Sequence, residues 1–113
     1  MAGADHPTTD SEETLLVLLA QSGDRGAFRT LVDRYDRRLL YFVRRIVNEA
    51  EDSYDIVQAV WMQVHRKLGS LRAPQAFRVW IYRIAHDQAV VVLRKRTRQP
   101  IVVDDTPLET IAD

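Results

Sequence analysis

The chain of 113 residues contains no cysteine, which excludes disulfide bridges and thiolate metal sites. It has four glycines and four prolines, and no Gly-rich phosphate-binding loop occurs among them. No apolar run approaches the ~20 residues that a membrane span requires, and residues 1–10 lack the basic and apolar regions of a secretory signal. We therefore expect no membrane insertion, and the absence of cysteine fits a reducing cytoplasm.

No group of residues predicts catalysis, a metal or a cofactor. The three histidines lie in separate segments and none has the spacing of a metal site. The acidic residues Glu51, Asp52 and Asp55 are better interpreted as charges at the start of a helix, where the helix dipole favours them. We predict no catalytic residue, no metal ligand and no cofactor, and an enzyme is the least favoured class.

The formal net charge of zero hides an uneven distribution of charge. All 16 basic residues and eight of the 16 acidic residues lie within residues 14–98, so this part of the chain carries a net charge of +8. The remaining eight acidic residues lie in the two terminal segments. A basic body with acidic ends is compatible with an ordinary charged surface, but it favours a polyanionic partner.

Hydrophobic residues recur at three- and four-residue spacing over four segments between residues 11 and 98, which predicts four helices and no sheet. Asp10 is expected to cap the first helix, with Glu13 completing a capping box, and Gly23 to end it. Asp24 is expected to cap the second helix. Residues 1–10 are expected to form a disordered acidic tail, so the predicted fold is an all-α, compact bundle of about four helices over residues 11–98.

The apolar positions of the last three helices predict much of the core. These positions are Phe28, Leu31, Val32, Tyr35, Leu39, Phe42, Val43 and Ile46, then Ile56, Val57, Val60, Trp61, Val64 and Leu68, then Phe77, Ile81, Ile84 and Ala85. Residues 48–52 interrupt the pattern between the second and third helices. Residues 69–73 are expected to form a turn, and Pro74 suits the first position of the fourth helix.

The fourth predicted helix mixes aromatic residues with arginines and ends in a basic cluster at residues 94–98. Arginines neutralise phosphates and aromatic rings stack on unpaired bases, so this helix is a candidate surface for nucleic acid with an opened strand. The alternative is that its aromatic residues belong to the core. Trp80 is adjacent to the apolar stripe, whereas Arg78, Tyr82, Arg83 and His86 are predicted on other faces.

The third predicted helix begins with an acidic and amide-bearing face. Asp52, Asp55 and Gln58 follow one another at three-residue spacing, which places them on one side of a helix. Such a face could meet basic residues of a partner protein.

Three segments resemble, in order and separation, the second conserved region of bacterial sigma factors of the extracytoplasmic-function (ECF) group. Residues 27–35 resemble the family's A-F-x-x-L-x-x-x-Y, and residues 55–61 resemble A-E-D-[LIV]-V-Q-E-V-F from its Asp onward. Residues 77–85 (F-R-V-W-I-Y-R-I-A) resemble F-R-x-W-L-Y-R-I-A. The resemblance covers residues 11–98 and implies the helical fold of sigma region 2 and a role in transcription initiation.

The resemblance implies two partners. The first is core RNA polymerase, whose largest subunit presents its clamp helices to Asp55 and Gln58, with Asp52 one turn earlier. The second is the nontemplate strand of the promoter −10 element, with a flipped base in the loop at residues 69–73. The DNA-binding residues implied by the resemblance are Ser70, Leu71, Arg72, Arg78, Tyr82, Arg83, His86, Asp87 and Arg94.

The chain departs from the family pattern at several positions. Tyr54 and Ala59 replace glutamates, which makes the polymerase face less acidic, and Asp87 places a negative charge where DNA is expected. We expect Asp87 to pair with Arg83 one turn earlier. These departures leave open the alternative of a helical protein–protein adaptor with a sigma-like fold and no DNA-melting role.

Residues 99–113 contain four acidic residues and two prolines. We expect them to form an acidic linker leading to a helix-turn-helix domain that lies outside this chain. The family also implies an anti-sigma factor as a candidate partner and a cytoplasmic location.

Overall fold

The computed structural model describes the backbone of residues 2–97 and the side chains of residues 11–96. The elements are α1 (Ala2–Gln21), α2 (Arg25–Val47), α3 (Ala50–Lys67), the short 3₁₀ helices η1 (Leu68–Ser70) and η2 (Pro74–Ala76), and α4 (Phe77–Thr97). No strand occurs within residues 2–97. The predicted all-α fold with four helices is confirmed, while the predicted linker at residues 99–113 lies outside the described residues.

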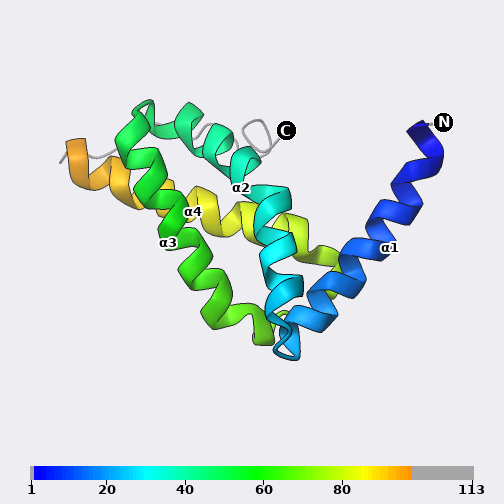
Figure 1. Cartoon of the computed structure of the whole chain (residues 1–113). Helices are drawn as coiled ribbons and strands as arrows, with labels where there is room; N and C mark the ends of the chain where they lie inside the picture. The colour runs from blue at the N-terminus through cyan, green and yellow to red at the C-terminus, as the bar shows by residue number, and fades with distance from the viewer. Residues whose placement is uncertain (1, 98–113) are drawn as a thin grey trace.

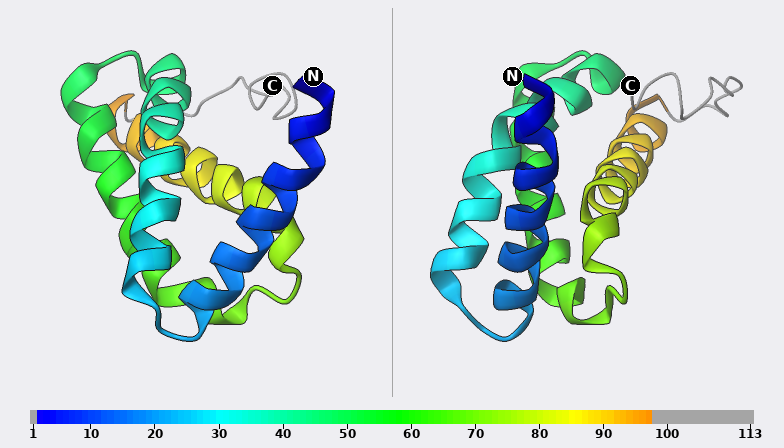
Figure 2. Two further views of the ribbon diagram at one scale, coloured as in Figure 1. Left: turned by 45° about the vertical axis from the view of Figure 1, so that its right-hand side comes forward. Right: turned by 90° about the vertical axis from the view of Figure 1, so that its right-hand side faces the viewer.

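Three helices meet at one end of the molecule, where the turn between α1 and α2 lies beside η1 (Figure 1). α4 crosses behind α2 and α3 in this view and packs against both. α1 packs against α2, and its N-terminal part diverges from the other helices (Figure 2). The loop from η1 to η2 therefore lies between α3, α4 and the end of α1.

The turn between α1 and α2 is specified by two adjacent residues. Gly23 has φ +103°, a conformation that glycine adopts without the steric cost of a Cβ. The Asp24 side chain accepts a hydrogen bond from the Ala27 amide at 3.0 Å, which confirms the predicted cap of α2.

The junction between α2 and α3 follows the predicted break. Asn48 adopts the left-handed conformation with φ 59°, and its amide donates to the Arg44 carbonyl, ending α2. The buried Ser53 hydroxyl donates to the Glu49 carbonyl at 2.7 Å, in the first turn of α3. These contacts turn the chain sharply, so that α2 and α3 pack against each other.

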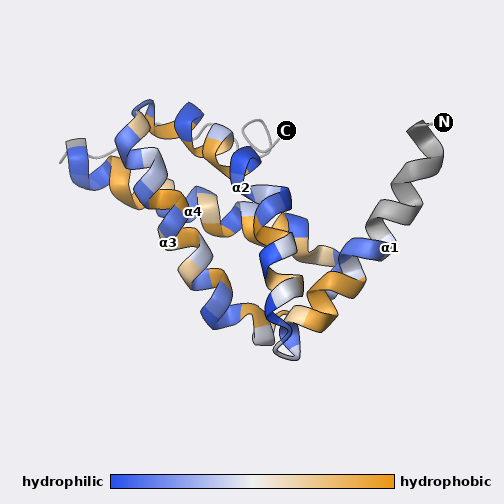
Figure 3. Cartoon of the chain, in the orientation of Figure 1, coloured by the Kyte–Doolittle hydropathy of each residue, from blue (hydrophilic) through white to orange (hydrophobic). Residues whose placement is uncertain are grey.

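The core is formed by one face of each of α2, α3 and α4, together with Val17 of α1 and Leu68 of η1. Its buried members are Val17, Leu31, Tyr35, Leu39, Phe42, Val43, Val47, Ile56, Val57, Val60, Val64, Leu68, Phe77, Ile81, Ala85 and Ala89. The orange segments in Figure 3 show that the C-terminal half of α1 is also strongly apolar. Leu15, Leu18 and Leu19 on this half stay exposed.

The start of α1 differs from the prediction. The helix begins at Ala2, so residues 2–10 have helical backbone and Asp10 is not a cap. Glu13 does not complete a capping box, because its carboxylate accepts a hydrogen bond from the Tyr35 hydroxyl of α2. A tertiary contact has replaced the local one that the sequence pattern suggested.

The start of α4 and its buried face also differ in detail. Pro74 opens η2, and α4 begins three residues later at Phe77. Ile84, predicted in the core, is only half-buried. The fully buried positions of α4 follow a four-residue spacing, and each such step turns about 40° beyond a full helical turn. The buried face therefore moves around the helix, away from Ile84.

Candidate functional site

Tyr82 lies at the seam between α4 and α2. Its ring packs edge-on against the Phe42 ring, with 5.0 Å between centroids, and against the Tyr35 ring at 6.4 Å. The Tyr82 side chain is half-buried and packs against the core. The prediction that it lies on a face away from the core is wrong, because the buried face of α4 moves towards it.

The charged residues of α4 lie at its surface. Arg78 and Arg83 are exposed, as is Asp87. The Nδ1 atom of the largely buried His86 lies 3.5 Å from Asp87 Oδ1, without hydrogen-bond geometry. Among the side chains that the structure describes, Asp87 forms no ion pair with Arg83 and lies next to His86 instead. The predicted pair of Asp87 with Arg83 is therefore wrong. Arg94, in the last turn, is also exposed.

The loop between α3 and α4 is attached to the end of α1. The Gln21 side-chain amide donates to the Leu68 carbonyl at 3.0 Å and to the Leu71 carbonyl at 2.8 Å. The Ser70 hydroxyl donates to the Lys67 carbonyl at 2.7 Å. Leu71 is partly buried and packs against the core, whereas Arg72 is exposed. The predicted flipped-base loop thus has a fixed backbone and one free cationic side chain.

Asp55 and Gln58 are both exposed on α3, as the predicted protein-binding face requires. They border a hollow of about 350 Å³ between α2 and α3, lined also by Tyr54 and Trp61. The indole Nε1 of Trp61 donates to Asp36 of α2 at 3.0 Å. A second hollow of about 540 Å³ continues from Gln58 and Trp61 along α3. The hydrogen bond to Asp36 therefore fixes the Trp61 ring where the two hollows meet.

Asp52 is not part of this exposed face. Its carboxylate lies 3.4 Å from Arg96 of α4, which also approaches Glu49 at 3.9 Å. The same guanidinium donates to the Val47 carbonyl at 2.9 Å. Arg96 therefore joins the end of α2, the start of α3 and the end of α4, and it occupies the carboxylate that was predicted to bind polymerase.

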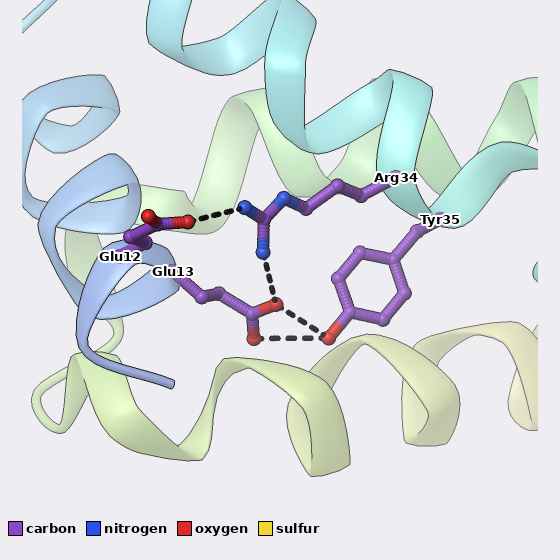
Figure 4. A network of polar contacts seen from close by, with 4 residues as sticks. All are labelled: Glu12, Glu13, Arg34 and Tyr35. Atoms are coloured by element: carbon purple, nitrogen blue, oxygen red, sulfur yellow. Dashed lines mark hydrogen bonds and ion pairs between the residues drawn. The ribbon is translucent and has the colours of Figure 1, made fainter. Parts of the chain in front are cut away.

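A group of polar residues joins α1 to α2 (Figure 4). The buried Tyr35 hydroxyl donates to the Glu13 carboxylate, with distances of 3.0 and 2.9 Å to its two oxygens. Arg34 lies 3.7 Å from Glu13 and 3.4 Å from Glu12. Burial raises the pKa of Tyr35 well above its usual value and Glu13 raises it further, whereas nearby arginines act in the opposite direction.

The amino-acid sequence of the chain matches the model of a known protein family. A model of sigma-70 region 2 matches residues 31–99, from the second turn of α2 to beyond α4. The chain belongs to the sigma-70 region 2 family. The matched residues include α3, the loop after it and α4, and they exclude α1.

Individual sigma factors show the same relationship. The chain is 36% identical over 92 residues to the RNA polymerase sigma-H factor of Pseudomonas aeruginosa, covering 81% of this chain and 48% of that protein. It is 36% identical over 97 residues to the ECF RNA polymerase sigma-E factor of Escherichia coli K12, covering 86% and 50%. The chain thus spans about half the length of the curated relatives that it matches.

A solved structure is similar over most of this chain. It is the NMR structure of an engineered region 2 of sigmaE in complex with GTAAAA. The TM-score is 0.67 and the identity 33%, over 78% of this chain and 94% of the other. The predicted family and fold are therefore confirmed.

Four contacts of this region 2 domain were not predicted from the sequence. They are made by Glu13, Gln21, Asp36 and Arg96, each to a residue more than 20 positions away. No local pattern marks them, because each polar side chain finds its partner on another helix.

Two further properties concern the described residues alone. Within the part of the chain whose side chains are described, no group of three or more His, Cys, Asp or Glu residues is placed to hold a metal ion. In the same part, every helix is too short or too polar to cross a membrane.

Proposed function

We propose that the chain is the promoter-recognition domain of an ECF sigma factor, which binds core RNA polymerase and helps to open the −10 element. The observation that carries this proposal is the similarity to a sigmaE region 2 in complex with GTAAAA. The role is non-catalytic, because it binds a strand and a protein without making or breaking a covalent bond. The domain would act in the cytoplasm, where the polymerase transcribes DNA.

The polymerase-binding surface is proposed at Asp55 and Gln58 of α3. Both side chains are exposed and border the hollow that contains Trp61, so a partner helix could meet an aromatic ring together with hydrogen-bonding groups. Asp52 is left out of this surface, since Arg96 holds its carboxylate. Aromatic residues in such hollows commonly carry much of the binding energy, which favours Trp61 as an additional contact.

The DNA-binding surface is proposed at the loop after α3 and along α4. Unstacking and unpairing a base costs a few kcal/mol, which contacts to the extruded strand must offset. A loop held by Gln21 loses little conformational freedom when it receives a base. Arg72, Arg78 and Arg83 are exposed and could contact phosphates, which adds affinity without reading sequence.

Binding of the 113-residue chain to core polymerase tests the α3 surface. Asp55→Arg reverses a charge at the proposed contact, and Gln58→Ala removes a hydrogen-bonding group, so both should lower the amount of polymerase that co-purifies. Asp87→Arg makes the same charge change on α4 and serves as the control, with binding retained. Unchanged binding of both α3 variants would show that polymerase uses a different surface.

Binding of single-stranded GTAAAA tests the α4 surface. Arg83→Ala and Arg94→Ala should each weaken binding and lower the slope of log K against log salt by about 0.7, the value for one phosphate contact on a single strand. An unchanged slope would show that these arginines do not contact DNA. Polymerase binding with no strand binding would favour the alternative of a protein–protein adaptor.

A further inference from the structure

A second aromatic and basic surface lies on α2. Arg38, Tyr41 and Arg45 follow one another at three- and four-residue spacing, which places them along one side of the helix. All three are exposed, and Tyr41 keeps 67% of its surface accessible although it is a large aromatic residue. We call these three residues the α2 stripe.

The charges of the α2 stripe are held in place without being neutralised. The Arg45 guanidinium lies over the Tyr41 ring at 5.8 Å from its centroid, and Arg38 lies over the Tyr35 ring at 5.7 Å. Among residues 11–96, no carboxylate is within ion-pair distance of Arg38 or Arg45. Cation–π contacts leave the N–H donors of a guanidinium available to another acceptor.

The α2 stripe adjoins the proposed DNA-binding surface of α4. The Tyr35 ring contacts both Arg38 and Tyr82, since Tyr82 packs edge-on against it at 6.4 Å. Phe42, next to Tyr41 in the chain, packs against Tyr82 at 5.0 Å. The two helices cross in direct contact (Figure 1), so the stripe lies beside Tyr82 of α4, with the buried Tyr35 ring between them.

We propose that the α2 stripe binds the single strand where it leaves α4, with Arg38 and Arg45 on phosphates and a base stacked on Tyr41. Arg38 and Arg45 are seven residues apart, which corresponds to about 10 Å along a helix, enough to contact separate phosphates. Arginines around an exposed aromatic ring are the arrangement by which proteins hold single strands without reading their sequence. This proposal rests on the DNA-binding role of α4 proposed above.

Strand length separates the two surfaces in an experiment. Binding to the 113-residue chain is measured with labelled GTAAAA and with the same strand extended at one end or the other. The extended strand that reaches the α2 stripe should bind more tightly than GTAAAA. Arg38→Ala with Arg45→Ala should remove that gain and lower the salt slope by about 1.4, while leaving the affinity for GTAAAA unchanged.

Two further variants sharpen the test. Tyr41→Ala should weaken the extended strand at least about fivefold, as expected for the loss of one stacked base. Arg25→Ala with Arg29→Ala removes the same charge from the same helix, about half a turn around it. This control variant should keep the full gain in affinity that extension of the strand gives.

The results test the α2 stripe and the DNA-binding surface of α4 separately. If extension gives no gain, or if the control loses as much as the stripe variant, the α2 stripe is not a strand-binding site. Loss of polymerase binding in the stripe variant, with strand binding unchanged, would assign the stripe to protein and overturn the proposal. Binding of an extended strand through the stripe, without binding of GTAAAA, would support the stripe and contradict the role of α4. If neither GTAAAA nor an extended strand binds, the proposed roles of the α2 stripe and of α4 are both wrong.

Discussion

Tyr35→Phe removes one hydroxyl group from the contact between α1 and α2 and leaves the buried ring in place. The hydroxyl donates to a carboxylate at 2.9–3.0 Å, and hydrogen bonds to charged groups contribute about 1.5–3 kcal/mol. Arg34 still pairs with Glu13 at 3.7 Å in the variant, and a partly exposed pair of this kind contributes no more than about 1 kcal/mol. We therefore expect a loss of about 2 kcal/mol in the free energy of unfolding.

Urea unfolding followed by far-ultraviolet circular dichroism measures this loss, with Tyr41→Phe as the matched control. Tyr41 is exposed and its hydroxyl makes no hydrogen bond to residues 11–96, so the same chemical change there should alter stability by less than about 0.5 kcal/mol. Equal effects of the two substitutions would refute the reasoning, because the Glu13 contact would then add nothing to stability.

The pH dependence of the same variant gives a second test. Because the pKa of Tyr35 is raised in the folded chain, the unfolded chain releases this proton first as the pH rises. The stability that Tyr35 provides is complete below about pH 10 and then falls by about 1.4 kcal/mol per pH unit. Tyr35→Phe lacks this loss, so its stability should approach that of the unmodified chain above pH ~10. Parallel pH profiles would contradict the raised pKa.

Three pairs of substitutions, each compared by urea unfolding, test the cap of α2, the contact of Arg96 with the end of α2, and the left-handed conformation of Asn48. Asp24→Ala should cost about 1 kcal/mol through the lost cap of α2, whereas Asp33→Ala, exposed within the helix, should cost less than about 0.5. Arg96→Met should cost about 1 kcal/mol, because the last carbonyl of α2 loses its donor, and Lys95→Met should be neutral. Asn48→Ala should cost about 1 kcal/mol and Asn48→Gly should not, because φ is 59°. Equal values within any of these pairs would show that the contact does not act as described.

The family and the order of helices could be predicted from the sequence because both depend on local patterns. The cap at Asp24 and the break after Val47 involve residues within a few positions of each other. The apolar spacing of α2 and α3 indicates most of their buried positions, although Phe28, Val32, Ile46 and Trp61 are only partly buried. These predictions needed no knowledge of how the helices cross.

The site was harder to predict because its residues depend on the crossing of helices. Asp52 matches the spacing of a protein-binding face, yet Arg96 lies 44 positions away in the sequence and holds its carboxylate. Tyr82 falls outside a straight apolar stripe, yet Phe42 and Tyr35 of α2 cover one side of its ring. Such outcomes follow from the packing of α4 on α2 and α3, which the pattern of a single helix does not contain.

The central claim is that this domain, held on core polymerase, selects the nontemplate strand of a promoter. The most direct measurement is selection from a pool of single strands with a randomised segment, using core polymerase with and without the chain. We predict that the chain enriches one short motif that polymerase alone does not enrich, and that Asp55→Arg abolishes this enrichment. A pool that stays random in the presence of bound chain would contradict the claim.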